Sequence, residues 1–252
     1  MKTQTFFIIT FLLFTSVMFA QVGINADDSS PDSSAMLDVK STSKGLLPPR
    51  MTRAQRNAIT SPGLGLIIYN TTANRPNYWN GMVWMNYDNT LSADIGDPYM
   101  GGIIAYILQP GDPGYVAGEF HGLIAAPSDQ GPYFQWGCMG TTIGSTSTAF
   151  GTGASNTVAI VNGCSTAGIA ARICNDLVLN GYDDWYLPSK DELNKLFLNK
   201  TAIGGFVSVA YWSSSESDQN PPFYSWAEFF TFGGQGGGNK DGPLAVRAIR
   251  AF

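Results

Sequence analysis

The clearest structural signal in the chain is the stretch Gly181-Tyr-Asp-Asp-Trp-Tyr-Leu-Pro-Ser-Lys-Asp-Glu-Leu193. Ser189 is a residue type preferred at the position before a helix, and Glu192 follows at the spacing of a capping box. The next apolar residues recur at helical spacing and are Leu193, Leu196 and Phe197. The stretch therefore predicts a helix that begins after Ser189 and packs one apolar face on a core.

The loop before this helix is acidic and aromatic. Asp183 and Asp184 are adjacent, so in extended backbone their side chains point to opposite sides and cannot form one carboxylate pair. One interpretation is a Ca²⁺ or sugar-hydroxyl acceptor, and the other is a loop ordered by local hydrogen bonds. We favour the structural role, with Asp184 ordering the loop and Trp185 buried. Arg247 and Arg250 are candidate partners for a carboxylate such as Asp184, in a structural ion pair.

The rest of this region predicts one more helix and several strands. The helix is expected from about 167 to 179, because Ile169, Ile173 and Leu177 recur every four residues and Asn180-Gly181 is a typical helix end. Strands are expected at 101–108, 122–126, 210–215, 224–232 and 244–252, and loops at 141–156 and 233–238. Strands and helices do not alternate, so residues 97–252 predict an α+β domain with two helices and antiparallel strands.

The N-terminal part predicts a secretion signal followed by a small β-rich module. Residues 1–20 combine Lys2, an apolar run and Ala20, which is typical of a signal peptide. Residues 21–90 then predict a stalk-like module. It contains a short helix over 52–59 with a Thr52–Gln55 capping box, a strand over 64–69, and a hairpin over 77–84 with Asn80-Gly81 as a two-residue turn. We expect the protein to be secreted or on the cell surface, with the periplasm as an alternative.

Composition disfavours several classes of function. The chain has 252 residues, of which 13% are charged, and a net charge of -5. From residue 97 onward it has 7 Lys and Arg against 13 Asp and Glu. Nucleic-acid binding requires a basic surface, so the C-terminal domain is not expected to bind DNA or RNA.

The chain has three cysteines, Cys138, Cys164 and Cys174. An exported protein with three cysteines favours one disulfide and one free thiol. We predict a bond between Cys164 and Cys174, while Cys138 paired with either of them stays open. The spacing matches no zinc site, and no metal or cofactor is predicted.

Catalytic motifs are missing from the sequence. His121 is the only histidine, so any His-based triad or metal site would have to use it, and a hydrogen-bonded structural role is favoured. The sequence contains no nucleophile elbow, no zinc-protease motif and no phosphate-binding loop. The prediction is a protein that is not an enzyme.

A polar loop between two aromatic strands is the best candidate for ligand binding. An aromatic surface surrounded by carboxylates and amides suits a sugar, which offers an apolar face and hydroxyl groups. Aromatic residues on strands are also common in cores, and this alternative stays open for the tryptophans. The candidate ligand residues are Trp212, Glu216, Asp218, Asn220, Tyr224 and Trp226.

Three stretches, in this order, resemble one known family: Asp184-Trp-Tyr-Leu-Pro-Ser189, Tyr211-Trp-Ser-Ser214 and Val246-Arg247. They are similar to the C-terminal domain of Legionella collagen-like adhesins, the Lcl C-terminal domain, over about residues 100–252. The resemblance implies a C-type-lectin-like fold, a binding module and trimeric assembly, and the named adhesin binds sulfated glycosaminoglycans. Here the collagen-like repeat is absent, the domain is acidic, and the Ca²⁺ motifs of sugar-binding C-type lectins are missing.

The N-terminal module resembles a second group of proteins. Its stretches Ala35-Met-Leu-Asp-Val-Lys40, Lys44-Gly-Leu-Leu-Pro-Pro-Arg-Met-Thr52 and Gly65-Leu-Ile-Ile-Tyr-Asn70 are similar to a module of Bacteroidetes surface proteins and phage tail fibres. That resemblance implies a stalk or a homotrimer. The leading hypothesis is therefore a surface adhesin that binds a glycan, a host or matrix component, or an envelope surface. The alternatives are a structural trimeric fibre and an enzyme on a lectin-like frame with a free thiol at or near Cys138.

Overall fold

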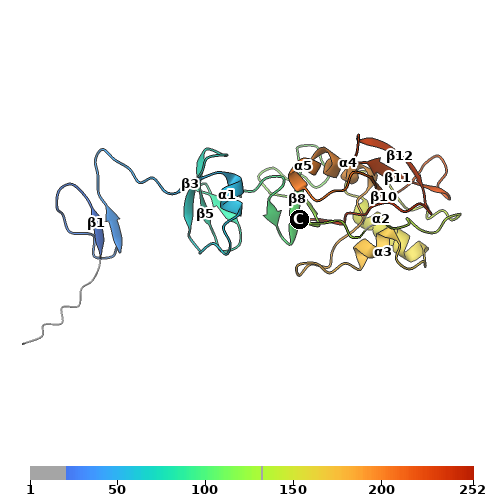
Figure 1. Cartoon of the computed structure of the whole chain (residues 1–252), viewed down its shortest axis with the longest axis horizontal. Coiled ribbons are helices and arrows are strands. Elements are labelled where there is room, and N and C mark those ends of the chain that lie inside the picture. Colours follow the sequence, from blue (N-terminus) through green and yellow to red (C-terminus); the bar gives the residue numbers. More distant parts are fainter. Residues whose placement is uncertain (1–20, 132) are drawn as a thin grey trace, which may run out of the picture. The chain divides into compact units, whose positions relative to one another are not determined.

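The computed structural model describes residues 21–131 and 133–252. The expected secretion signal at 1–20 lies outside the described residues. The chain divides into two compact units, with the boundary in the sequence between Pro49 and Arg50. Figure 1 labels the helices and strands of both units.

The first unit contains a small parallel sheet of two strands, β1 (Val22–Ile24) and β2 (Leu37–Val39). Side chains alternate along a strand, so the apolar residues of both strands lie on one face. Each of these side chains is more than a third exposed. They pair across the sheet, Val22 with Leu37 and Ile24 with Val39. Within the described residues this apolar face is therefore largely uncovered.

The second unit begins with a four-stranded sheet and a short helix. The sheet has the order β3-β4-β5-β6. Its strands are β3 (Arg50–Met51), β4 (Ile67–Asn70), β5 (Arg75–Trp79) and β6 (Trp84–Asn86), and the helix is α1 (Arg53–Asn57). The predicted Thr52–Gln55 capping box is confirmed. The predicted two-residue turn is wrong. Four residues join β5 and β6, because the Asn80 side chain accepts the N–H groups of Met82 and Val83 and widens the turn.

A second four-stranded sheet joins the start and the end of the C-terminal region. Its order is β13-β9-β8-β7, and all its pairs are antiparallel. Its strands are β7 (Pro98–Tyr99), β8 (Gly102–Ile107), β9 (Gly122–Ala125) and β13 (Ile249–Ala251). The strands predicted at 101–108 and 122–126 are thus confirmed, while the closing strand is shorter than predicted.

A three-stranded antiparallel sheet completes the region, with the order β10-β11-β12. Its strands are Ala210–Glu216, Tyr224–Phe229 and Gly234–Asn239. The prediction of a loop at 233–238 is wrong, because the glycines form β12. A side chain at Gly238 would place its Cβ 2.5 Å from the Trp212 ring, so close packing on Trp212 explains this glycine. Glycines give no periodic apolar pattern, which hides the strand from the sequence.

Four helices lie in the same region: α2 (Gly153–Gly163), α3 (Ala170–Asn175), α4 (Lys190–Leu198) and α5 (Lys200–Ile203). The predicted start of α4 is confirmed, since Ser189 and Glu192 form both hydrogen bonds of a capping box. In Figure 1, α4 lies beside the β10-β11-β12 sheet, and α2 lies beside α3. The domain is therefore α+β.

The described part of this domain has four helices rather than the two predicted, and two predicted boundaries also need correction. The predicted loop at 141–156 ends earlier, because α2 begins at Gly153. Ile160 is the one large apolar residue on its buried face, where Asn156 and Thr157 are hydrogen-bonded to Ser214 and Leu187, so the apolar pattern of a helix is weak. Helix α3 ends at Asn175 rather than near residue 179.

The loop before α4 is held as predicted, and the two arginines have different partners. Trp185 is buried in the core. Arg250 binds both carboxylate oxygens of Asp184, at 2.6 and 2.8 Å. Arg247 is fully buried and bonds Asp129 at 2.8 Å instead. The Arg250 hydrogen bonds hold the pKa of Asp184 below its usual value.

Candidate functional site

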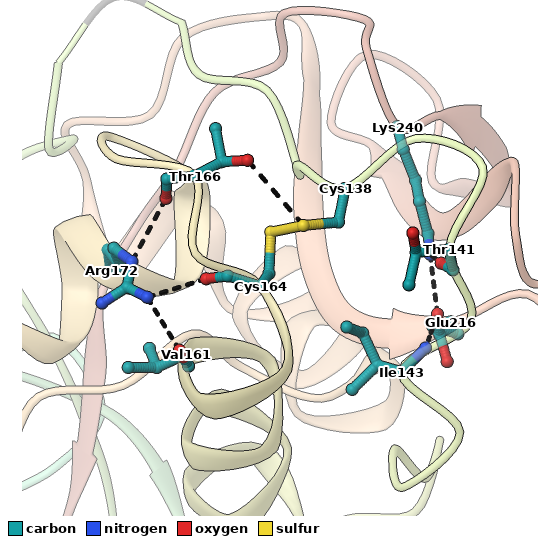
Figure 2. Close-up of a disulfide and its surroundings, with 9 residues drawn as sticks. All are labelled: Cys138, Thr141, Ile143, Val161, Cys164, Thr166, Arg172, Glu216 and Lys240. Carbon is teal, nitrogen blue, oxygen red and sulfur yellow. Dashed lines mark hydrogen bonds and ion pairs between the residues drawn. A yellow bond between two sulfur atoms is a disulfide. The ribbon is translucent and has the colours of Figure 1, made fainter.

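A disulfide holds one end of an ordered loop, residues 139–148, in the C-terminal region. The bond joins Cys138 to Cys164, with the Cα atoms 5.8 Å apart (Figure 2). The predicted Cys164–Cys174 bond is therefore wrong. Cys174 is a free, fully buried thiol in α3, and burial raises its pKa. Because a reactive cysteine needs an accessible thiolate, neither Cys138 nor Cys174 supplies the thiol that the enzyme hypothesis requires.

Arg172 supports the other side of the disulfide. Its guanidinium donates to the carbonyls of Val161 and Cys164 at 2.7 Å and to that of Thr166 at 3.1 Å (Figure 2). These carbonyls lie at and just beyond the end of α2, where backbone oxygens lack helical partners and a cation is favourable. Arg172 thus fixes Cys164, and through the disulfide it fixes the start of the loop.

A buried ion pair holds the middle of the 139–148 loop. Glu216, at the end of β10, accepts hydrogen bonds from the backbone N–H groups of Ile143 and Gly144 at 2.8 and 2.7 Å. Lys240 donates to Glu216 at 2.6 Å and to the carbonyl of Thr141 at 2.9 Å (Figure 2). The loop is therefore held through its backbone.

The environment of Lys240 is protein on every side. Its side chain is fully buried, and its ammonium lies 4.3 Å from the centre of the Trp136 ring. Burial lowers the pKa of Lys240, and the Glu216 carboxylate partly opposes this change. An ammonium in this position depends on its carboxylate partner, because an isolated charge is costly to bury.

A surface hollow of about 400 Å³ lies between the 139–148 loop and the polar loop after β10. We call it the hydroxyl-lined hollow. Thr142, Thr148 and Asp218 are exposed residues, and their side chains make no hydrogen bond to described residues. Its lining is Thr142, Gly144, Thr146, Ser147, Thr148, Glu216, Ser217, Asp218 and Pro221.

The structure places the predicted ligand residues in different environments. Asp218 and Glu216 border the hydroxyl-lined hollow, but Glu216 is bonded to the loop. Trp212 is fully buried and donates its indole N–H to the carbonyl of Phe134, so it offers no surface to a ligand. Asn220 and Tyr224 are exposed outside the hollow, and the half-buried Trp226 ring lies under the Lys190 ammonium. The structure therefore does not gather these residues into one aromatic platform.

The hollow also contains residues that the sequence reasoning placed only in a surface loop. Thr142 and Thr148 belong to a Ser/Thr-rich segment, and that composition is the signal that marks them. Lys240 does not line the hollow but helps to hold its loop. No sequence signal marks it, because its carboxylate partner is 24 residues away in the sequence. Within the described residues no group of three or more His, Cys, Asp or Glu side chains is arranged to hold a metal ion.

Comparison with known protein families supports the resemblance inferred from the sequence. Residues 132–250 match the Lcl C-terminal domain. The disulfide, the ion pair and the hydroxyl-lined hollow all lie within these matched residues. Residues 23–96 match the phage tail like trimerisation region. No curated protein matches the chain.

Among the described residues, no helix has the length and apolar character needed to cross a bilayer.

Proposed function

We propose that the chain is an exported, non-enzymatic surface adhesin that binds a neutral glycan in the hydroxyl-lined hollow. The observation that carries the proposal is the hollow itself. The Thr142 and Thr148 hydroxyls and the Asp218 carboxylate line it together, beside a loop that is held through its backbone. Threonine hydroxyls donate and accept hydrogen bonds and a carboxylate accepts them, which suits the hydroxyl groups of a sugar. The acidic charge of the domain disfavours a sulfated ligand.

A C-type-lectin-like frame is part of this proposal. Its support is the antiparallel pairing of the last strand, β13, with β9, which places the start and end of the region in one sheet. The second sheet and its long loops then carry the hollow. The surface location rests on the match to the Lcl C-terminal domain and on the expected secretion signal.

The glycan proposal is tested by screening the full chain on an array of neutral and sulfated glycans. For a neutral glycan that binds, the Asp218→Asn variant is expected to bind about tenfold or more weakly, because hydrogen bonds to a charged group contribute about 1.5–3 kcal/mol. The matched control is Asp241→Asn, which removes an exposed carboxylate that does not line the hollow. Equal loss in both variants, or binding to no neutral glycan, contradicts the proposal.

A trimeric assembly is the second part of the proposed function, and a purely structural fibre is the alternative. Its specific support is the apolar face of β1 and β2, together with the match to a trimerisation region. A two-stranded sheet is at best marginally stable alone, so other copies of the chain are the natural cover for this face. A fibre that assembles but binds no ligand would support the structural alternative.

The trimer is expected to dissociate when a charge enters this face. Ile24→Asp places a carboxylate among apolar side chains, and burying an unpaired charge is strongly unfavourable. Ser30→Asp adds the same charge at an exposed position outside both strands and should leave assembly unchanged. Sedimentation or light scattering of the full chain measures the mass. A monomeric parent chain would contradict the trimer, and an Ile24→Asp variant that stays trimeric would show that the face of β1 and β2 is not the trimer interface.

A further inference from the structure

A separate cavity of about 290 Å³ lies beside the first turn of α2 and shares no lining residue with the hydroxyl-lined hollow. Its walls come from the end of β8, the start of β9, α2 and the residues around Phe252. The largest apolar side chains among them are Leu108, Leu123, Phe150 and Phe252, and the polar side chains are His121, Tyr186 and Glu192. The proposed adhesin function does not use this cavity.

The apolar walls are fixed by packing. Leu123 is buried in β9. Phe150 packs edge-on against Tyr106, with 5.6 Å between the ring centres, and Phe252 packs against Tyr99 at 5.2 Å. A cavity whose walls are held in this way is formed before a ligand arrives, as is usual for small-molecule sites.

One hydroxyl group in the lining is placed to bind a ligand. Tyr186 is 8% exposed and lines the cavity, and its hydroxyl interacts with the neighbouring carboxylate of Glu192. Burial, reinforced by the nearby Glu192 carboxylate, raises the pKa of Tyr186 well above its usual value, so the group stays a hydroxyl. A tyrosine hydroxyl that donates to a carboxylate still has an oxygen that accepts a hydrogen bond, so it can accept one from a ligand hydroxyl.

Glu192 has a different role at the same place. Its carboxylate is fully buried and accepts the backbone N–H groups of Gly151 at 3.1 Å and Ser189 at 2.8 Å. It therefore holds the loop before α2 and the start of α4 together. Burial raises the pKa of Glu192, and a carboxyl group at this wall disfavours an anionic ligand, while the apolar walls disfavour a strongly hydrated cation.

We propose that this cavity binds a small, uncharged ring compound whose single hydroxyl group bonds to Tyr186. An apolar cavity of roughly 150 Å³ holds benzene, so about 290 Å³ holds a ring with a small substituent. Drug-sized ligands occupy roughly 300–1,000 Å³, which places larger molecules outside its capacity.

The test compares p-cresol with toluene, two rings that differ by one hydroxyl group, by ligand-observed NMR titration of the full chain. We expect saturable p-cresol binding with a Kd of about 1 mM or below, and binding of toluene about fivefold to tenfold weaker. Tyr186→Phe keeps the ring and removes the hydroxyl, so it should abolish the difference between the two compounds. No saturable binding of p-cresol, or an unchanged preference in Tyr186→Phe, overturns the proposal.

A blocking variant locates the site independently. Ala154 is exposed on α2 and lines the cavity, so Ala154→Leu should fill its mouth and weaken p-cresol binding at least tenfold. Ser155→Leu adds the same side chain at the next position, which does not line the cavity, and should bind as the parent does. If both variants behave alike, p-cresol binds elsewhere and the assignment fails.

Discussion

Glu216→Gln is expected to lower the free energy of unfolding by about 3–5 kcal/mol, because it leaves the Lys240 ammonium buried without a carboxylate. The glutamine amide also cannot accept both backbone N–H groups of the 139–148 loop with the strength of a carboxylate. Denaturant unfolding followed by tryptophan fluorescence measures the change. An unfolding free energy equal to that of the parent would show that the pair does not hold the loop.

Two further variants separate the ion pair from a general packing defect. Asp241→Asn removes an exposed carboxylate beside Lys240 in the sequence and should change stability by no more than about 0.5 kcal/mol. The double variant Glu216→Gln, Lys240→Met removes both charges. It should be more stable than the sum of the single effects predicts, because partners in one network are not additive. Additive effects would argue against direct coupling.

Removal of the disulfide by Cys138→Ala is expected to cost about 3–4 kcal/mol of stability. The bond closes a loop with a sequence separation of 26, and the loss of this constraint increases the entropy of the unfolded chain. The melting temperature should fall on the order of 10 °C. Reduction of the parent chain should have a similar effect, which calorimetry with and without a reductant measures.

Cys174→Ala is the matched control for the disulfide. It removes a buried thiol but keeps the Cys138–Cys164 bond, so it should cost about 1 kcal/mol and leave the response to reductant intact. In the parent chain, alkylation without reduction should label Cys174 only after unfolding. A peptide that links Cys164 to Cys174 under non-reducing conditions would contradict the observed pairing.

Local signals in the sequence predicted the parts of the fold that depend on neighbouring residues. Both capping boxes were predictable, because the residues that form each one are three positions apart. The apolar strands β8 and β9 were predictable from composition. Helix α2 and strand β12 were not, because α2 buries two polar side chains beside Ile160 and β12 has almost no side chains to form a pattern.

The candidate site was only partly predictable for a different reason. Asp218 was identified because polar residues in a loop between strands are rarely buried. The partners of Glu216 lie 72 and 73 residues before it and 24 residues after it, so nothing near Glu216 in the sequence distinguishes a ligand carboxylate from a structural one. The disulfide prediction was wrong for the same reason. Which two cysteines come together depends on how α2 and the loop fold together, and not on residues near each cysteine in the sequence.

The way in which the 139–148 loop is held also has a consequence for evolution and for protein engineering. Glu216 and Lys240 bind backbone N–H and carbonyl groups, which every substitution by a residue other than proline preserves. The side chains of Thr142, Thr148 and Asp218 take no part in these contacts. These three positions can therefore be diversified together in a library with little loss of stability, and the frame can acquire new binding specificities while the fold stays constant.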